Sequence, residues 1–299
     1  MTKHLGLMLA AALAAPAADP GLLGLAMPDA RVVAGLNVAE IRKSPFGQLL
    51  LDRLSAREDE HFRRFIAGTG FDPRRDVEEI VVVATGADRN AGKLILARGW
   101  FDPPRFISYA VNHGARLTHY GGVDIIETRQ SALAFLDSTT AVAGDPGSVR
   151  DAIDRRTGGS ALDPDLTARI QALSAAQQVW FVSKIPVSEL NLPRHQANPA
   201  LGNVVNEVEG ASGGAAFGNT ADVKVEIISR TPQGAAELAG AARLLATLAQ
   251  SARNPAAERL RPVWNSLDIK ALENVVTIAL MIPSEVIEPN AGILQPARR

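Results

Sequence analysis

The chain contains no cysteine, and this absence excludes several kinds of chemistry. Without thiols there is no disulfide framework, thiolate metal site, thiol nucleophile or lipid-modified cysteine. Aromatic residues make up only 5% of the 299 residues. A net charge of −1 gives no general electrostatic attraction to nucleic acid or anionic lipid. We therefore expect a globular protein with no nucleic-acid partner.

Long apolar runs are also lacking, with one short exception at the start of the chain. Residues 1–18 combine a cationic start, at Lys3 and His4, with an apolar stretch too short to span a bilayer as an ordinary helix. Small-x-small patterns end at Ala14 and at Ala17, so signal peptidase cleavage after either residue remains open. We expect an exported protein, periplasmic or secreted, with no transmembrane helix after cleavage.

Proline next to a capping residue marks the start of several expected helices. An aspartate or serine side chain accepts hydrogen bonds from unpaired N–H groups, and proline presets φ at a first helical position. Such pairs occur at Ser44-Pro45, Asp72-Pro73, Asp102-Pro103, Asp145-Pro146 and Asp163-Pro164. Helical periodicity follows at least three of them.

Short β-branched runs alternate with these helices and predict strands. Expected strands are 31–38, 78–85, 93–101 and 179–185. Turn residues indicate further hairpins at Gly121-Gly122, Asp137-Ser138 and Gly218-Asn219, and between 267–273 and 274–282. This order predicts an α+β fold of antiparallel sheets with helices packed on one face.

The order β-α-β-β-α-β-β occurs twice, as a repeat of pattern rather than of residues. We divide the chain into a signal peptide (1–18), a first α+β half (27–155), a connector (156–176), a second α+β half (177–283) and a loose tail (284–299). In the second half, helices are expected near 198–207, over 232–250 and over 256–265.

Residues Gly210–Gly214 satisfy G-x-S-x-G, the nucleophile elbow of α/β-hydrolases. That elbow requires a strand before the serine and a helix after it, whereas the pattern here predicts the reverse. The hydrolase triad also needs a histidine after the serine, and all five histidines come earlier. We interpret the motif as a glycine-rich turn from a helix to a strand.

Other candidate motifs lack the spacing that their chemistry needs. Gly86–Lys93 is one residue too long for a phosphate loop, and a strand rather than a helix follows it. The metal candidates, Glu58–His61 and the pair His113 and His119, lack ligand geometry. Carboxylate pairs occur without aromatic residues brought beside them for a carbohydrate site, at Glu78/Glu79, Asp151/Asp154 and Glu207/Glu209. We predict no catalytic, cofactor-binding or metal site.

Residues 232–250 form the one expected helix with an unusual composition. Alanine and leucine surround its whole circumference, interrupted by Glu237, Arg243 and a few neutral polar residues. Such a helix is expected to be buried on nearly every side. It could also line an apolar groove or a protein interface, for which the candidate residues are Leu238, Leu244, Leu245 and Leu248.

Three runs carry a resemblance to known proteins: MPDARVVAGLNVAEIRKSPFGQLL, GFDPRRDVEEIVVV and SALAFLDSTTAVAGDPGSVRDAID. They resemble secreted bacterial proteins of no assigned activity in which a strand–helix–hairpin unit is duplicated. The resemblance covers about residues 27–155, and it implies a fold but no site.

Three function classes remain open. The export signal, the lack of a catalytic constellation and the apolar helix favour a non-enzymatic extracytoplasmic binding or envelope-associated protein, whose partner is an apolar ligand or another protein. A secreted hydrolase would need groups that converge only in the folded chain. A structural or assembly component is the third class.

Overall fold

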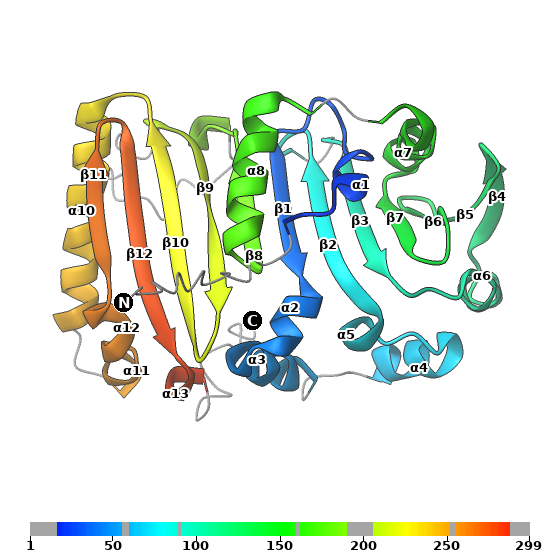
Figure 1. Cartoon of the computed structure of the whole chain (residues 1–299), viewed down its shortest axis with the longest axis horizontal. Helices are drawn as coiled ribbons and strands as arrows, with labels where there is room; N and C mark the ends of the chain where they lie inside the picture. The colour runs from blue at the N-terminus through cyan, green and yellow to red at the C-terminus, as the bar shows by residue number, and fades with distance from the viewer. Residues whose placement is uncertain are drawn as a thin grey trace, which may run out of the picture.

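The structure is a computed structural model that describes residues 17–55, 60–88, 91–159, 162–189, 206–251 and 255–287 (Figure 1). Its centre is one 12-stranded sheet in which all neighbouring strands pair antiparallel. From edge to edge the strands are β11 (Asp268–Leu272), β12 (Val275–Pro283), β10 (Thr220–Ser229), β9 (Val208–Phe217), β8 (Val179–Ser183), β1 (Val32–Asn37), β2 (Val77–Ala84), β3 (Lys93–Gly99), β7 (Thr140–Gly144), β6 (Ala132–Phe135), β5 (Val123–Glu127) and β4 (Arg116–Tyr120). The predicted α+β class is confirmed.

The described helices lie on the faces and around the ends of this sheet. They are α1 (Pro20–Leu23), α2 (Val38–Lys43), α3 (Pro45–Ser55), α4 (Glu60–Thr69), α5 (Pro73–Asp76), α6 (Pro103–Asn112), α7 (Pro146–Gly158), α8 (Pro164–Ala176), α10 (Pro232–Ser251), α11 (Pro255–Arg259), α12 (Arg261–Asn265) and α13 (Ser284–Ile287), with a 3-10 turn at Val187–Glu189. Within the described ranges, no helix has the length and apolarity needed to cross a membrane.

The capping residues identified in the sequence start helices as expected. Side-chain oxygens of Asp72, Asp102, Asp145 and Asp163 accept backbone N–H hydrogen bonds at the first turns of α5, α6, α7 and α8. Ser44 does the same for α3, because the N–H of Gly47 donates to its Oγ at 3.0 Å. These signals are local, so they operate wherever the helix later packs.

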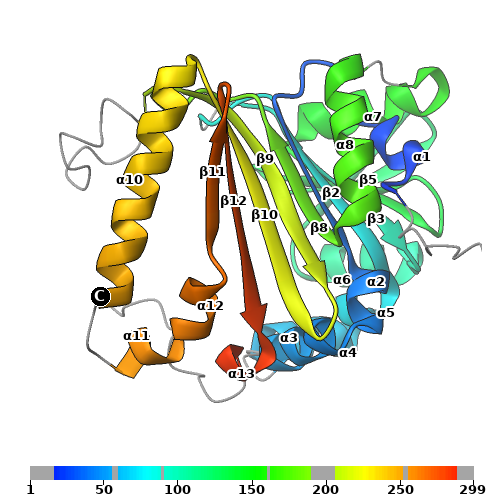
Figure 2. The ribbon, with the colours of Figure 1, turned by 60° about the vertical axis from the view of Figure 1, so that its left-hand side comes forward.

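Helices cover both faces of the sheet, and Figure 2 shows α8 and α10 on opposite sides of it. We call these faces the α8 face and the α10 face. Every second residue of a strand points to the same face of the sheet. On the α8 face these residues, which include Val33, Val81 and Leu96, form the main core beneath α1, α7 and α8. On the α10 face, Ala235 and Ala239 of α10 form a smaller core with Val276 of β12.

The two expected halves share one sheet because their first strands, β1 and β8, pair with each other. Residues 19–26, which the sequence pattern left unassigned, contribute to the main core together with Ala18 and Met27 on either side. Leu22 and Ala26 are fully buried there, and the backbone N–H of Ala18 donates to Ser174 Oγ at 2.9 Å. The start of the described chain is therefore anchored against α8.

Charged side chains lie along both open edges of the sheet. Asp268 and Lys270 form an ion pair on β11. On β4, Arg116 pairs with Glu127 at 3.6 Å and His119 with Asp124 at 2.9 Å.

Some expectations for the second half were wrong. Gly210–Gly214 lies within β9 rather than in a turn from a helix to a strand. The helix expected over 256–265 is two short helices, α11 and α12, separated at Leu260. The helix expected near 198–207 lies almost entirely outside the described residues.

Candidate functional site

Ser212, the serine of the G-x-S-x-G motif, is a buried structural residue. Its Oγ accepts hydrogen bonds from Nε and Nη2 of Arg169 on α8, at 3.0 and 2.8 Å. Arg169 also pairs with Glu226 of β10. The serine faces a cation instead of a general base, and no strained turn exposes it, so the geometry of a nucleophile elbow is absent here.

The segment Gly86–Lys93 connects β2 and β3, as the sequence predicted, although residues 89 and 90 lie outside the described part. The loop closes with a hydrogen bond from the N–H of Gly92 to Thr85 Oγ1 at 3.0 Å. Because a strand follows, no helix N-terminus is present to hold a phosphate.

The two histidines of the candidate pair, His113 and His119, have separate partners. Nδ1 of His113 lies 2.7 Å from the carbonyl oxygen of Tyr109, and Nδ1 of His119 lies 2.9 Å from the Asp124 carboxylate. In the acidic run, Glu60 pairs with Arg64 at 2.6 Å, while residues 58 and 59 lie outside the described ranges. Across the part of the chain that is described, no three His, Asp or Glu side chains form a metal-binding group.

Among the carboxylates, Glu79 has the most perturbed ionisation. It lies on the α8 face of β2, where both its oxygens accept from the backbone N–H of Asp19 at 3.2 and 3.3 Å. Burial raises the pKa of Glu79 to about 7, opposed by that hydrogen bond. The Asp19 carboxylate, which pairs with Arg98 at 2.8 Å, raises the pKa of Glu79 further, and Arg98 lowers it. We interpret Glu79 as a structural residue that holds the start of the described chain.

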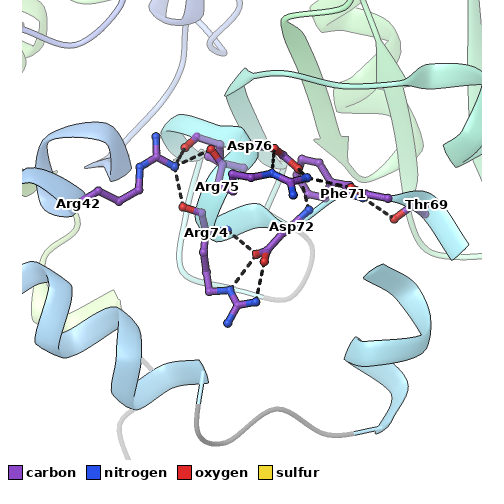
Figure 3. Close-up of polar contacts among 9 residues, drawn as sticks. Arg42, Thr69, Phe71, Asp72, Arg74, Arg75 and Asp76 are labelled. Atoms are coloured by element: carbon purple, nitrogen blue, oxygen red, sulfur yellow. Dashed lines mark hydrogen bonds and ion pairs between the residues drawn. The ribbon is translucent and has the colours of Figure 1, made fainter. Parts of the chain in front are cut away.

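The arginines around α5 form a structural network, shown in Figure 3. Nη1 of Arg42 donates to the backbone carbonyls of Arg74, Arg75 and Val77, at 2.6, 2.8 and 3.1 Å. The carboxylates of Asp72 and Asp76 pair with Arg74 and Arg75, each at 2.6 Å. These contacts connect α2 and α5 to the start of β2. We therefore interpret the network as stabilising the fold.

The candidate leucines of α10 lie on two different sides of the helix. Leu238 packs into the smaller core with Ile227 and Ile269. Leu244, Leu245 and Leu248 are exposed, at 61%, 51% and 58%. The expectation that this helix is buried on nearly every side was wrong, because the sheet covers only one of its faces.

A candidate binding surface lies on the α10 face of the sheet, between α10 and α6. Register places the outward residues of five central strands on this face. We call this surface the apolar face; its members are Val32, Ala34, Leu36, Ile80, Val82, Ile95, Ala97, Val179, Phe181, Ala211, Gly213 and Ala215.

No described helix lies over the middle of the apolar face. Helices α1, α7 and α8 pack on the opposite face, and α2, α3 and α5 lie at strand ends (Figure 1). Consequently Val82 of β2 and its cross-strand partner Ile95 of β3 remain 41% and 45% exposed. Two large apolar side chains exposed side by side on a sheet face make this surface the candidate binding site.

Helices stand at the rims of the apolar face. At one end α10 packs on β10, β11 and β12. At the other end α6 packs on β4 and β5 and joins α4 through an aromatic cluster in which Phe106 contacts Phe65 and Phe71. Near α3, Phe46 packs on Phe217 at 5.5 Å between ring centroids. Any partner must therefore fit between these helices.

No single strand of the sequence signals the apolar face directly. Each strand carries only two or three of its residues, and alternation alone does not show which face a helix will cover. The signal that could have found it is that strands such as 78–85 are apolar on both faces, while too few helices are available to cover both.

The chain shares its fold with solved structures of known proteins. No family model and no curated protein matches it. Solved structures of TP0453 are similar, at 12% identity: crystal form I has a TM-score of 0.50 and covers 90% of this chain and 94% of that one. Forms IV and III both have a TM-score of 0.53, with 89% and 90% of this chain and 94% and 96% of theirs covered. This likeness shows a shared fold and nothing of function.

Proposed function

We propose that the chain is an exported, non-enzymatic binding protein that holds an apolar, chain-like molecule against the apolar face. The observation that carries this proposal is the five-strand apolar surface between α6 and α10, over which no described helix lies. The export pattern of residues 1–18 supports a place outside the cytoplasm.

The chemistry of the apolar face favours an acyl chain over a polar ligand. Its members are aliphatic side chains, one phenylalanine and one glycine. The polar side chains that register adds to the same face, Ser183 and Lys93, lie at one end of their strands, away from its middle. Burial of apolar area gives about 25 cal/mol per Å² without directional demands. Across five strands the face measures about 19 Å, from a strand spacing of about 4.8 Å. An extended acyl chain fits such a surface.

The polar sites of the chain support binding rather than catalysis. Ser212 is held by Arg169, and His113 and His119 have separate partners. A hydrolase would need a nucleophile and a base within hydrogen-bond distance of each other. The described side chains bring no such pair together at the apolar face.

The test measures binding of a fluorescent fatty acid to the full chain. Val82→Asp places a charge in the apolar face, and we expect at least a tenfold weaker binding. Met281→Asp is the matched control, because Met281 is 40% exposed on the α8 face, opposite Asp222. Equal affinity of both variants and the parent, or no binding by the parent, would contradict the proposal.

A further inference from the structure

A partly enclosed apolar pocket lies between α6 and the sheet, on the α10 face. Its cavity volume is about 380 Å³, within the range of about 300–1,000 Å³ that is typical of ligand pockets. We call it the α6 pocket. Its walls include Phe65 of α4, Phe106, Tyr109 and Ala110 of α6, and Ile126 and Leu133 of β5 and β6.

Aromatic contacts hold the helical wall of the α6 pocket in place. The ring of Phe65 lies edge-on to the rings of Phe106 and Tyr109, at 5.9 and 5.7 Å between centroids. Tyr109 also stacks on His113 at 4.1 Å. Rings packed in this way restrain one another, so this wall is formed before any ligand arrives.

The apolar face continues into the α6 pocket along one row of cross-strand partners. Val82 pairs with Ile95, Ile95 with Ala143, Ala143 with Leu133, and Leu133 with Ile126. Residues directly opposite each other on neighbouring strands point to the same face of the sheet. An unbroken row of apolar side chains therefore leads from the exposed pair, Val82 and Ile95, into the pocket.

The polar groups of the α6 pocket already have partners in the chain. Nδ1 of His113 donates to the carbonyl oxygen of Tyr109 at 2.7 Å, because a carbonyl can only accept. The hydroxyl of Thr128 donates to the carbonyl of Ser131 at 3.2 Å. No Lys or Arg is among the described residues that line the pocket. A carboxylate would lose hydration there without a cationic partner, whereas a methyl group has no hydrogen bonds to lose.

We propose that the α6 pocket holds the methyl end of an acyl chain, whose remaining length lies across the apolar face. This inference rests on the proposed function, because one ligand occupies both surfaces. Each methylene group that enters the pocket adds about fourfold to the affinity, from about 0.8 kcal/mol per buried CH₂.

Chain length separates the pocket from the apolar face. Leu133 and Val82 are three strands apart, or about 14 Å at a strand spacing of about 4.8 Å. Octanoate has seven carbon–carbon bonds of about 1.5 Å and spans less than about 11 Å, while palmitate is about twice as long. Octanoate should therefore occupy only the pocket, and palmitate should occupy the pocket and reach Val82.

Methyl NMR spectra of the parent protein test this placement without any substitution. Octanoate should shift the methyl resonances of Ile126 and Leu133 and leave those of Val82 in place. Palmitate should shift all three. Octanoate shifts at Val82 without shifts at Ile126 and Leu133 would overturn the proposal, and so would an absence of shifts with both acids.

Calorimetric titration of variants measures the contribution of the pocket. Ala110→Phe fills it and should weaken the binding of both acids at least tenfold. Ala115→Phe fills it from beyond the end of α6 and should have the same effect. Val111→Phe is the matched control, because Val111 is 46% exposed and does not line the pocket. Parent-like affinity of both pocket variants for both acids would contradict the proposal.

Val82→Asp distinguishes failure of the pocket from failure of the apolar face. It should weaken palmitate binding and leave octanoate binding unchanged. If palmitate binding is lost in Ala110→Phe but kept in Val82→Asp, the proposed function of the apolar face is wrong and the pocket alone binds the chain. If only Val82→Asp weakens palmitate, the apolar face binds and the pocket inference is wrong.

Discussion

The indole ring of Trp180 on β8 occupies the space above Gly35 on β1, directly opposite in register. A Cβ at Gly35 would overlap Cε2, Cζ2 and Nε1 of that ring. Trp180 is among the largest fully buried side chains of the described protein. Since β1 and β8 are the first strands of the two expected halves, this pair closes the junction between them.

Gly35→Ala should destabilise the protein because the ring of Trp180 must move. Overpacking of this kind costs about 1–3 kcal/mol. Gly35 does not have a positive φ, so the cost arises from packing and not from backbone strain. Urea unfolding measures the change, and Gly240→Ala is the control. At that open helical position alanine should stabilise by up to about 1 kcal/mol. Equal effects at both glycines would contradict this account.

Stability should depend on pH through Glu79. Its pKa is raised from 4.5 to about 7 in the folded protein, so the folded state binds the proton more tightly than the unfolded state. The contribution of Glu79 to the free energy of unfolding should therefore be largest below about pH 4.5, fall as pH rises to about 7, and be level above. Because Glu79 is only partly buried, we expect a fall of roughly 1–3 kcal/mol.

Glu79→Gln should remove this dependence, as denaturant unfolding at pH 4.5, 6 and 8 would show. Glu78→Gln is the control, since it removes one carboxylate from the adjacent position of β2. The account fails if the parent and the Glu79→Gln protein keep parallel pH profiles.

Arg42→Ala should loosen the contact of α2 and α5 with β2. The substitution leaves three carbonyls without their shared donor, and we expect a loss of about 1–3 kcal/mol. Arg105→Ala removes an exposed ion pair with Asp102, at 3.2 Å, and should cost less than about 1 kcal/mol. Thermal unfolding of both variants distinguishes the two cases, and similar losses would count against a bridging role for Arg42.

Leu22→Ala should be strongly destabilising, although residue 22 lies only a few positions after the expected leader. Leu22 is fully buried in the main core, so the cost should be about 3–5 kcal/mol. Leu272→Ala, at an exposed position on β11, should change stability by less than about 0.5 kcal/mol. If chemical denaturation gave Leu22→Ala a similarly small effect, residues 17–27 would not be part of the cooperative core.

The sequence predicted the elements that depend on neighbouring residues. Proline after Asp102 and Asp145 located helix starts, and the hairpin at Gly121-Gly122 formed as expected, with both glycines at positive φ. Such signals require only the few residues that make the cap or turn.

The features that the sequence did not predict depend on contacts between strands that are far apart in the chain. The pairing of β1 with β8 joins residues almost 150 positions apart, and no local pattern encodes it. The glycines around Ser212 were taken for a turn, yet at Gly213 and Gly214 a Cβ would overlap carbonyls of β10 and β8. The candidate leucines of α10 divided between core and solvent because the position of the sheet, and not helix composition, decides which side is covered.

Charge at both borders of the sheet limits how this protein can assemble. Asp268 and Lys270 on β11, and Arg116 and His119 on β4, are side chains that discourage a neighbouring chain from adding a strand. Fibrous growth by strand addition is thereby opposed at either end.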